Sequence, residues 1–126
     1  MFLSRRPQES YPSSEFIELD LTKQEKLKKF RESHPRFNTL VESGLELIGE
    51  EKANETQSRY IREFLWKLAV VVSMQESRET ITRDHMKAIG DIIVQRINVA
   101  FPDFARQANE YMTDIKLFDH LLNGRT

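Results

Sequence analysis

The stretch from residue 56 to residue 97 constrains the fold most, because it holds two amphipathic helical patterns in succession. In its first half, four apolar residues recur at the spacing of one helical stripe: Ile61, Leu65, Leu68 and Val72. Other apolar residues widen that stripe almost all round: Phe64, Trp66, Val70, Val71 and Met74. We therefore expect a long helix whose middle is buried on several sides.

A second helix is expected to fold back on the first. The long helix should end near Ser77, since the charged residues that follow break the apolar pattern. Thr82 can cap a new helix, because its hydroxyl accepts a free backbone N–H of the first turn, and Asp84 suits the positive end of the helix dipole. Ile81 is an apolar plug in the connector between the two helices. The returning helix carries apolar residues on one face: Met86, Ile89, Ile93 and Ile97.

The composition indicates one helical domain and excludes several kinds of site. A chain of 126 residues can bury a core of its own, and its 4 glycines and 4 prolines leave room for few turns. Without cysteine, neither a disulfide nor a thiolate metal site can form. The formal net charge of −1 gives no overall attraction to nucleic acid or to membranes.

Residues 1–14 contain prolines and serines and are predicted to form a flexible arm, with a single helical domain over residues 15–126. Residues 1–10 lack the apolar core of a signal peptide, and the longest apolar run, residues 68–72, is too short for a membrane span. We therefore expect a cytoplasmic protein that does not enter a membrane. Residues 16–21 alternate in the manner of a strand and are predicted to form one short extended segment.

Two shorter helices are predicted before the long one. Thr22 and Glu25 have the spacing of a capping box, and the helix that they open should end before Pro35. This helix is basic, with charges at Lys23, Lys26, Lys28, Lys29 and Arg31. The next helix should begin near Pro35 and bury Phe37, Leu40, Val41, Leu45 and Ile48. Its opposite face is acidic, with Glu42, Glu46 and Glu50.

The basic and acidic helices have two interpretations. The plainer one is that they lie side by side and partly neutralise each other, since charged side chains usually cover helix surfaces. The other is that the basic cluster contacts the phosphates of a nucleic acid, through Lys23, Lys26, Lys28, Lys29 and Arg31. No aromatic residues are interleaved with these charges to stack on bases, because Phe30 and Phe37 are expected in the core.

A last helix is predicted from near Asp103, because Pro102 disfavours helix at the residue before it. Its apolar residues alternate by four and three: Phe104, Ala108, Tyr111, Ile115, Phe118 and Leu122. Packing inside one domain is the plainer explanation of this seam, and self-association through it is the alternative. Asn123 and Gly124 are expected to stop the helix.

The usual sequence signs of catalysis are absent. The chain has neither of the common glycine patterns that bind nucleotide phosphates, and no serine or threonine in the glycine-flanked setting of a nucleophile. None of its 3 histidines follows a glutamate by three positions, as in a di-iron bundle, so the acidic stripe of Glu42, Glu46 and Glu50 is expected to be solvated surface. We predict a non-enzymatic protein that holds no metal and no cofactor.

Residues 16–98 resemble the small helical lid of AAA+ ATPases. Residues 16–22, Phe-Ile-Glu-Leu-Asp-Leu-Thr, followed by a charged short helix, are similar to the last core strand and its entry into the lid. Residues 58–89 resemble the final two lid helices of the MoxR and minichromosome-maintenance branches, in which a helix that begins with an arginine leads to a charged turn, Ile/Val-Thr and an acidic-led helix. The resemblance implies that Arg59 is a sensor-2 arginine, which touches the γ-phosphate of ATP. This sequence lacks the Walker motifs of the core domain, so a partner would have to supply the nucleotide.

The same stretch also resembles a histone fold, with a long central helix between two short ones and a connector of the Arg-x-Thr-Ile-Thr kind. That resemblance implies a handshake dimer, often bound to DNA. The connector departs from the pattern, because Glu76 and Glu79 lie beside Arg78 where a DNA contact would need basic residues.

The whole sequence predicts an all-α bundle of about five helices, with a flexible N-terminal arm and one short extended segment. The expected function is that of a non-enzymatic protein interaction module similar to an AAA+ lid, whose partner is an ATPase or a second copy of the chain. A small dimeric DNA-associated protein of the histone-fold type is the alternative. A helical adaptor related to neither family is a third interpretation.

Overall fold

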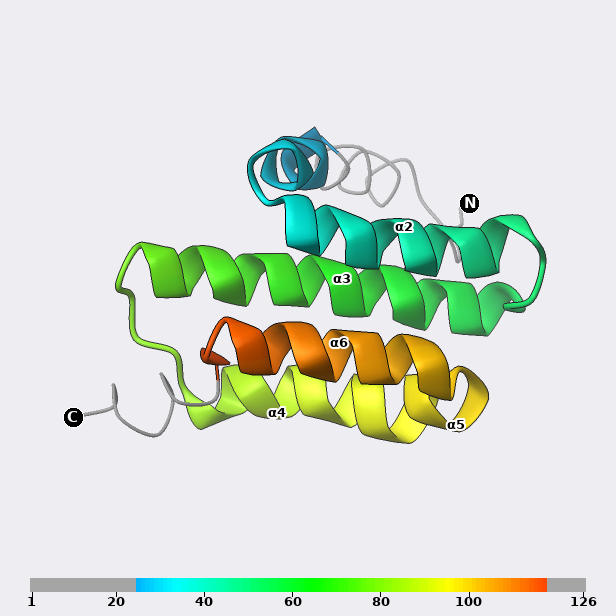
Figure 1. Ribbon diagram of the computed structural model, residues 1–126. Coiled ribbons are helices and arrows are strands. Elements are labelled where there is room, and N and C mark those ends of the chain that lie inside the picture. The colour runs from blue at the N-terminus through cyan, green and yellow to red at the C-terminus, as the bar shows by residue number, and fades with distance from the viewer. Residues whose placement is uncertain (1–24, 118–126) are drawn as a thin grey trace, which may run out of the picture.

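The computed structural model describes residues 25–117, and between these residues it contains helices and no strand (Figure 1). The predicted all-α bundle is confirmed. In chain order the elements are the first helix (residues 25–33), α2 (Pro35–Gly49), α3 (Glu55–Glu76), α4 (Arg83–Ile92), the π-helical turn η1 (Ile93–Ile97), α5 (Asn98–Ala100) and α6 (Pro102–Asp114). The predicted arm at residues 1–14, the extended segment at residues 16–21 and the Thr22 cap lie outside the described residues.

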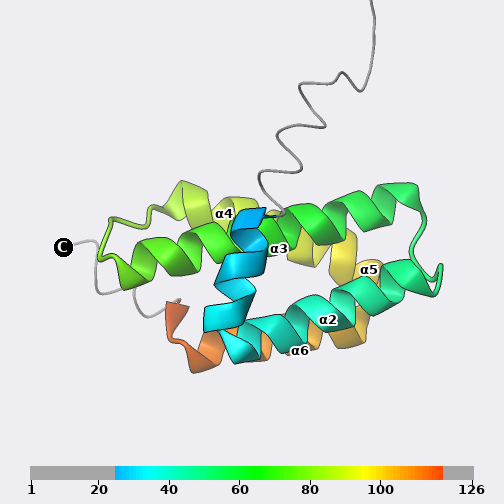
Figure 2. The ribbon, with the colours of Figure 1, turned by 90° about the horizontal axis from the view of Figure 1, so that it is seen from above.

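The long helices form a closed ring around the core. α3 packs on α2 and on α4, which continues into η1, and α6 closes the ring by packing on α2 and on η1. Figure 2 shows the molecule from above, with α2 over α6 and α3 over α4. The first helix lies outside this ring and crosses α3 at a steep angle, so it is seen nearly end-on in Figure 1.

Capping side chains determine where α3 and α4 begin. Thr82 Oγ1 accepts the backbone N–H of His85 at 3.2 Å, and His85 Nδ1 accepts the N–H of Thr82 at 3.1 Å. The predicted cap at Thr82 is therefore confirmed. A second capping box, which the sequence did not lead us to expect, opens α3: Asn54 and Gln57 each accept the other's backbone N–H at 2.8 Å. Both boxes satisfy backbone donors that a helix start leaves free.

α3 supplies the centre of the core. Its predicted stripe is buried, together with two of the residues that widen it: Phe64, Val71, Ile61, Leu65, Leu68 and Val72. Val70, however, is 38% exposed, so one side of the predicted apolar surface faces solvent while several other sides are buried, as expected. Val70 follows the buried Leu68 by two positions, which in an α-helix puts it on nearly the opposite side.

α2 approaches α3 closely because the residue at the contact has no side chain. Gly44 is buried, and a Cβ at this position would lie 3.0 Å from Ile61 Cγ2 and 3.2 Å from Phe104 Cε1. Leu45 is 41% exposed, and its predicted burial is wrong because the residue after Gly44 is turned by about 100° away from that contact. The other apolar residues predicted for this face are buried or partly buried: Phe37, Leu40, Val41 and Ile48.

The connector and the returning helix follow the prediction closely. Ile81 is buried, which confirms it as the apolar plug between α3 and α4. All the residues predicted for the core face of the returning helix are buried: Met86, Ile89, Ile93 and Ile97. The π turn at residues 93–97 is the one departure from a regular helix here, and no sequence pattern predicted it.

α6 begins at Pro102, close to the predicted start, and ends earlier than predicted. Its last residue is Asp114, and the backbone then turns through Lys116, whose φ of 58° is left-handed. The predicted unbroken helix as far as Leu122 is therefore wrong after Asp114. Phe118 and Leu122 lie outside the described residues. The earlier part of the predicted seam is buried in, or packed against, the core of its own chain, as the plainer interpretation requires: Phe104, Ala108, Tyr111 and Ile115.

Filling the contact at Gly44 is expected to destabilise the fold. Gly44→Val should lower the free energy of unfolding by about 2 kcal/mol, because the added side chain must displace Ile61 and Phe104. A Cβ at Gly90 in α4 would meet nothing within 4 Å, so Gly90→Ala is the control and should stabilise the protein by up to about 1 kcal/mol through helix propensity. Urea denaturation followed by circular dichroism measures both, and equal midpoints would contradict the close approach.

Candidate interaction site

Three lysines of the first helix face solvent while the opposite side of that helix rests on the core. Lys26, Lys28 and Lys29 are exposed, whereas Leu27 and Phe30 are partly buried against the core. Leu27 and Phe30 share one side of the helix because they are three positions apart. None of the ion pairs within residues 25–117 includes the three lysines. Their charges are therefore available to a partner.

The other basic residues of this region are used inside the chain. Arg31 Nε donates to Asn38 Oδ1 at 2.5 Å, and Arg36 forms an ion pair with Asp114 at the end of α6. Lys23 lies outside the described residues. Of the predicted phosphate-contacting cluster, the structure thus leaves the three lysines free and places Arg31 in a contact between the first helix and α2.

The acidic stripe of α2 is not neutralised by the first helix. Glu42, Glu46 and Glu50 are exposed, and in the part of the chain that the structure describes no ion pair joins them to the first helix. Glu50 pairs instead with Lys52 at 2.9 Å. The prediction of mutual neutralisation is wrong because the chain changes direction before Pro35, which sends the first helix across α3 instead of along α2 (Figure 2).

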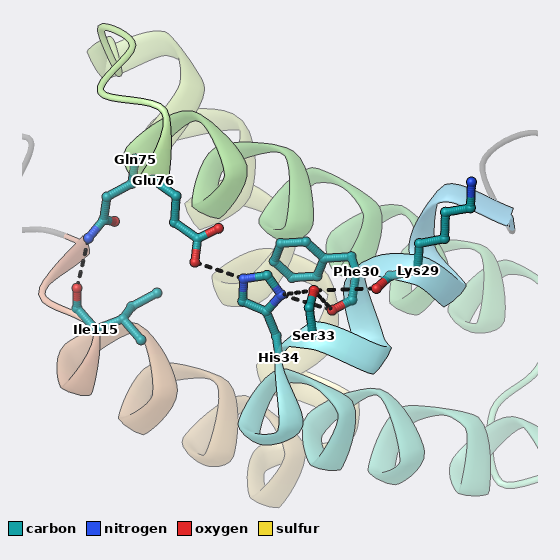
Figure 3. A network of polar contacts seen from close by, with 7 residues as sticks. All are labelled: Lys29, Phe30, Ser33, His34, Gln75, Glu76 and Ile115. Atoms are coloured by element: carbon teal, nitrogen blue, oxygen red, sulfur yellow. Dashed lines mark hydrogen bonds and ion pairs between the residues drawn. The ribbon is translucent and has the colours of Figure 1, made fainter.

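A polar network fixes the junction between the first helix and α2 (Figure 3). His34, which lies between the two helices, places Nε2 2.7 Å from Glu76 Oε2 at the end of α3. Its Nδ1 lies 2.8 Å from the carbonyl oxygen of Phe30 and 2.9 Å from Ser33 Oγ. The Phe30 ring stacks on the imidazole with the ring centroids 3.7 Å apart. One side chain therefore ties the first helix to the end of α3.

The end of α3 also holds the end of α6. Gln75 Nε2 donates to the carbonyl oxygen of Ile115 at 2.9 Å (Figure 3), while Gln75 Oε1 is buried without a hydrogen-bond partner in the described structure. Tyr111 of α6 is buried as well. Burial, reinforced by the charge of Glu76 and opposed by that of Arg36, raises the pKa of Tyr111 to about 12. The ends of α3 and α6 therefore meet at a polar corner beside His34.

Arg59, the predicted sensor arginine, is exposed in the second turn of α3. Among residues 25–117 it takes part in none of the ion pairs. Seventeen positions separate it from Glu76 in the same helix, which corresponds to about 25 Å along the axis. Arg59 and the His34 junction are therefore separate sites. Near the start of α3, the Arg96 guanidinium of η1 lies 5.2 Å from the ring centroid of Tyr60.

Two strongly exposed valines form a candidate contact that the sequence patterns did not reveal. Val94 in η1 is 61% exposed and Val99 in α5 is 79% exposed. In a regular α-helix, residues five positions apart point about 140° away from each other. Val94 lies in the π turn, which has hydrogen bonds between residues i and i+5, and Val99 lies in α5 directly after it. The π turn has no signal in the sequence, so the pair could not be predicted.

The remaining surface offers little chemistry. In the described part of the chain, no group of three or more His, Asp or Glu side chains is arranged to hold a metal ion. Among the helices of residues 25–117, none combines the length and the apolar character needed to cross a membrane. A groove of about 520 Å³ runs along α6, but its charged residues are already in ion pairs: Arg106 with Glu110, and Asp114 with Arg36.

Because of Tyr111, we expect the protein to lose stability in alkaline solution. Because the pKa of Tyr111 in the folded protein is about 12, above the ordinary value of about 10, the phenol ionises first in the unfolded chain. The free energy of unfolding should be unaffected below about pH 10 and should fall by up to about 3 kcal/mol as the pH rises to about 12. Urea denaturation at about pH 9 and about pH 11.5 measures this fall.

Two phenylalanine variants distinguish the ionisation of Tyr111 from other effects of alkaline pH on stability. Tyr111→Phe removes the buried phenol and should abolish most of the fall. Tyr60→Phe leaves Tyr111 in place, and this variant should show the same fall in the free energy of unfolding as the parent protein. If both variants lose stability to the same extent as the parent, the alkaline transition has another origin.

No family model matches the chain, and no curated protein or solved structure matches it at a significant level. The resemblances to AAA+ lids and to histone folds therefore stay predictions from the sequence. Three features of the described surface carry charged or polar groups that can bind a partner. They are the free lysines of the first helix, the His34 junction and the exposed Arg59.

Proposed function

We propose that this chain is a non-enzymatic interaction module that docks on an acidic protein surface through its first helix. The observation that carries the proposal is the set of three exposed lysines, Lys26, Lys28 and Lys29, which no ion pair within residues 25–117 neutralises. Because the formal net charge of the whole chain is −1, the attraction is local to this helix. Such local charge directs the orientation and the rate of association.

The anchoring of the first helix supports a docking role. Leu27 and Phe30 pack against the core, Arg31 bonds to Asn38, and His34 bonds to Glu76. A helix that is already formed and held in place loses less conformational entropy on binding than a flexible segment does. The lysines are therefore presented at little cost to a partner.

The aromatic residues of this region favour a protein partner over a nucleic acid. Proteins that bind single strands offer exposed aromatic rings on which bases stack. Phe30 instead stacks on His34 and meets the edge of Phe37 with the ring centroids 4.9 Å apart, and Phe37 is fully buried. The three lysines on their own would give contact with phosphates without any reading of bases.

The lid resemblance narrows the class of partner within this proposal. A short charged helix, a second helix, a long helix with an arginine near its start and a Thr-capped returning helix follow one another in the order expected of an AAA+ lid. Arg59 is exposed at the start of α3 and could reach a nucleotide that a partner holds. An ATPase is therefore the partner that we favour.

A closed core argues against the histone-like alternative. A handshake dimer shares its core between two chains, so each chain alone leaves its central helix open. In this chain the apolar face of the central helix α3 is buried by α2, α4 and η1. Among the described residues of α3, Val70 is the one large apolar side chain that is exposed.

The protein is therefore expected to be a monomer. Light scattering on a sizing column should give the mass of one chain, 14.9 kDa, over a range of protein and salt concentrations. A dimer that persists on dilution would contradict the closed core and would favour the histone-like interpretation.

Binding to an acidic surface should depend on the lysines of the first helix. A fluorescent glutamate-rich peptide serves as the probe, and its anisotropy is followed as the full chain is added. Replacing Lys26, Lys28 and Lys29 together by Gln should weaken binding at least about tenfold, and added salt should weaken binding by the parent protein.

A matched variant distinguishes the helix from the net charge. Replacing Lys52, Lys67 and Lys87 by Gln removes the same charge from three lysines that are paired with Glu50, Glu63 and Asp91. This variant should bind within about twofold of the parent protein. Equal losses in the two triple variants would contradict the proposal. Tighter binding of a DNA duplex than of the peptide would favour the nucleic-acid alternative instead.

A further inference from the structure

We infer that His34 is a proton-operated clasp, which holds the first helix on the bundle more firmly when its imidazole carries two protons and less firmly when one of them leaves. The inference concerns how the lysine-bearing helix is held, which goes beyond what that helix binds. It is tested without a partner, so its failure and that of the docking proposal are distinguishable.

Two hydrogen-bond acceptors face the two ring nitrogens of His34 (Figure 3). Nε2 lies 2.7 Å from a carboxylate oxygen of Glu76, and Nδ1 lies 2.8 Å from the carbonyl oxygen of Phe30. An ionised carboxylate and a carbonyl can only accept, so each contact is a hydrogen bond only if the nitrogen carries a proton. An imidazolium donates to both acceptors at once, and its bond to Glu76 is then assisted by opposite charges.

Ser33 offers a neutral imidazole an alternative hydrogen-bond partner. Its Oγ lies 2.9 Å from His34 Nδ1, 3.1 Å from the carbonyl oxygen of Phe30 and 3.3 Å from that of Lys29. The hydroxyl has one hydrogen to donate. Beside the imidazolium it bonds to a carbonyl, and beside a neutral ring it turns to Nδ1. Deprotonation thus removes donors from the Phe30 carbonyl and leaves that carbonyl facing a lone pair.

The elements that meet at the clasp carry these charged and titratable groups: Lys29 and Arg31 on the first helix, Arg36 on α2, Glu76 on α3, and Tyr111 and Asp114 on α6. Glu76 is in direct contact with the imidazole. Arg36 is neutralised by its ion pair with Asp114. Tyr111, with its pKa of about 12, stays neutral at ordinary pH. Glu76 is thus the charged group that contacts the ring directly.

The clasp matters because, in the described structure, the first helix is otherwise attached by the bond from Arg31 to Asn38 and by two apolar side chains. Leu27 and Phe30 are only partly buried, and Phe30 stacks on the imidazole itself. Weakly anchored elements open locally without unfolding the rest of a protein. Loss of the proton should therefore loosen residues 25–33 while α2 and α3 stay folded, so that the lysines are held most firmly in mildly acidic solution.

Hydrogen exchange of the full chain between about pH 5.5 and about pH 8 tests the clasp, because imidazoles titrate in this range while carboxylates stay ionised. After correction for intrinsic exchange rates, the amides of residues 29–33 should be about tenfold less protected at the higher pH, as expected for the loss of a hydrogen bond to a charged group. Protection of α3 should not change, which serves as the internal reference.

Three variants make the result specific to His34. In His34→Gln, residues 29–33 should be weakly protected at both pH values. In Glu76→Gln, which keeps an acceptor and removes the charge at an exposed position, the pH effect should shrink to about threefold or less. His85→Gln is the matched control, because His85 Nδ1 accepts the N–H of Thr82 and so needs a lone pair and not a proton; this variant should keep the full pH effect.

Two results would overturn the inference. One is protection of residues 29–33 that does not depend on pH in the parent protein. The other is the same pH effect in the parent and in His34→Gln. If His34→Gln loses protection throughout α3, Glu76→Gln decides instead, and an undiminished pH effect in that variant overturns the inference.

Discussion

The close approach of α2 to α3 at Gly44 is the contact on which the rest of the structure depends. Because no side chain separates the helices there, Ile61 and Leu65 of α3 and Phe104 of α6 pack directly against the α2 backbone. The direction of α2 also determines where its first turn lies, and with it the positions of His34 and of the first helix. A wider separation of α2 and α3 would draw His34 away from Glu76, so core packing and the polar junction are parts of one arrangement.

Features that depend on neighbouring residues in the sequence could be predicted. The stripe of α3, the cap at Thr82 and the burial of Ile81 follow from helical periodicity and side-chain chemistry within a few positions. Features that depend on which helices pack against each other could not be predicted. Leu45 fits an apolar stripe as well as Val41 does, but Gly44 decides which side of α2 meets α3. The end of α6 before the left-handed Lys116 likewise has no clear signal, since the apolar spacing continues past it.

In the candidate site, too, local features could be predicted and contacts between distant residues could not. Its lysines were recognisable as a basic cluster, and their exposure follows from the positions of Leu27 and Phe30 on the other side of the helix. The partners of the other charges were not recognisable, because the contact of His34 with Glu76 joins residues 42 positions apart. The direction of the first helix depends on the break in the chain before Pro35, and that direction decides which charges can pair.

The ring of helices begins and ends at the same place, because the Arg36–Asp114 ion pair joins the first turn of α2 to the last turn of α6 across 78 positions of sequence. The points at which the chain enters and leaves the ring therefore lie side by side. A unit with this property can be placed within a surface loop of another protein without forcing the two sides of that loop apart, and its helices can be reconnected in a circularly permuted order.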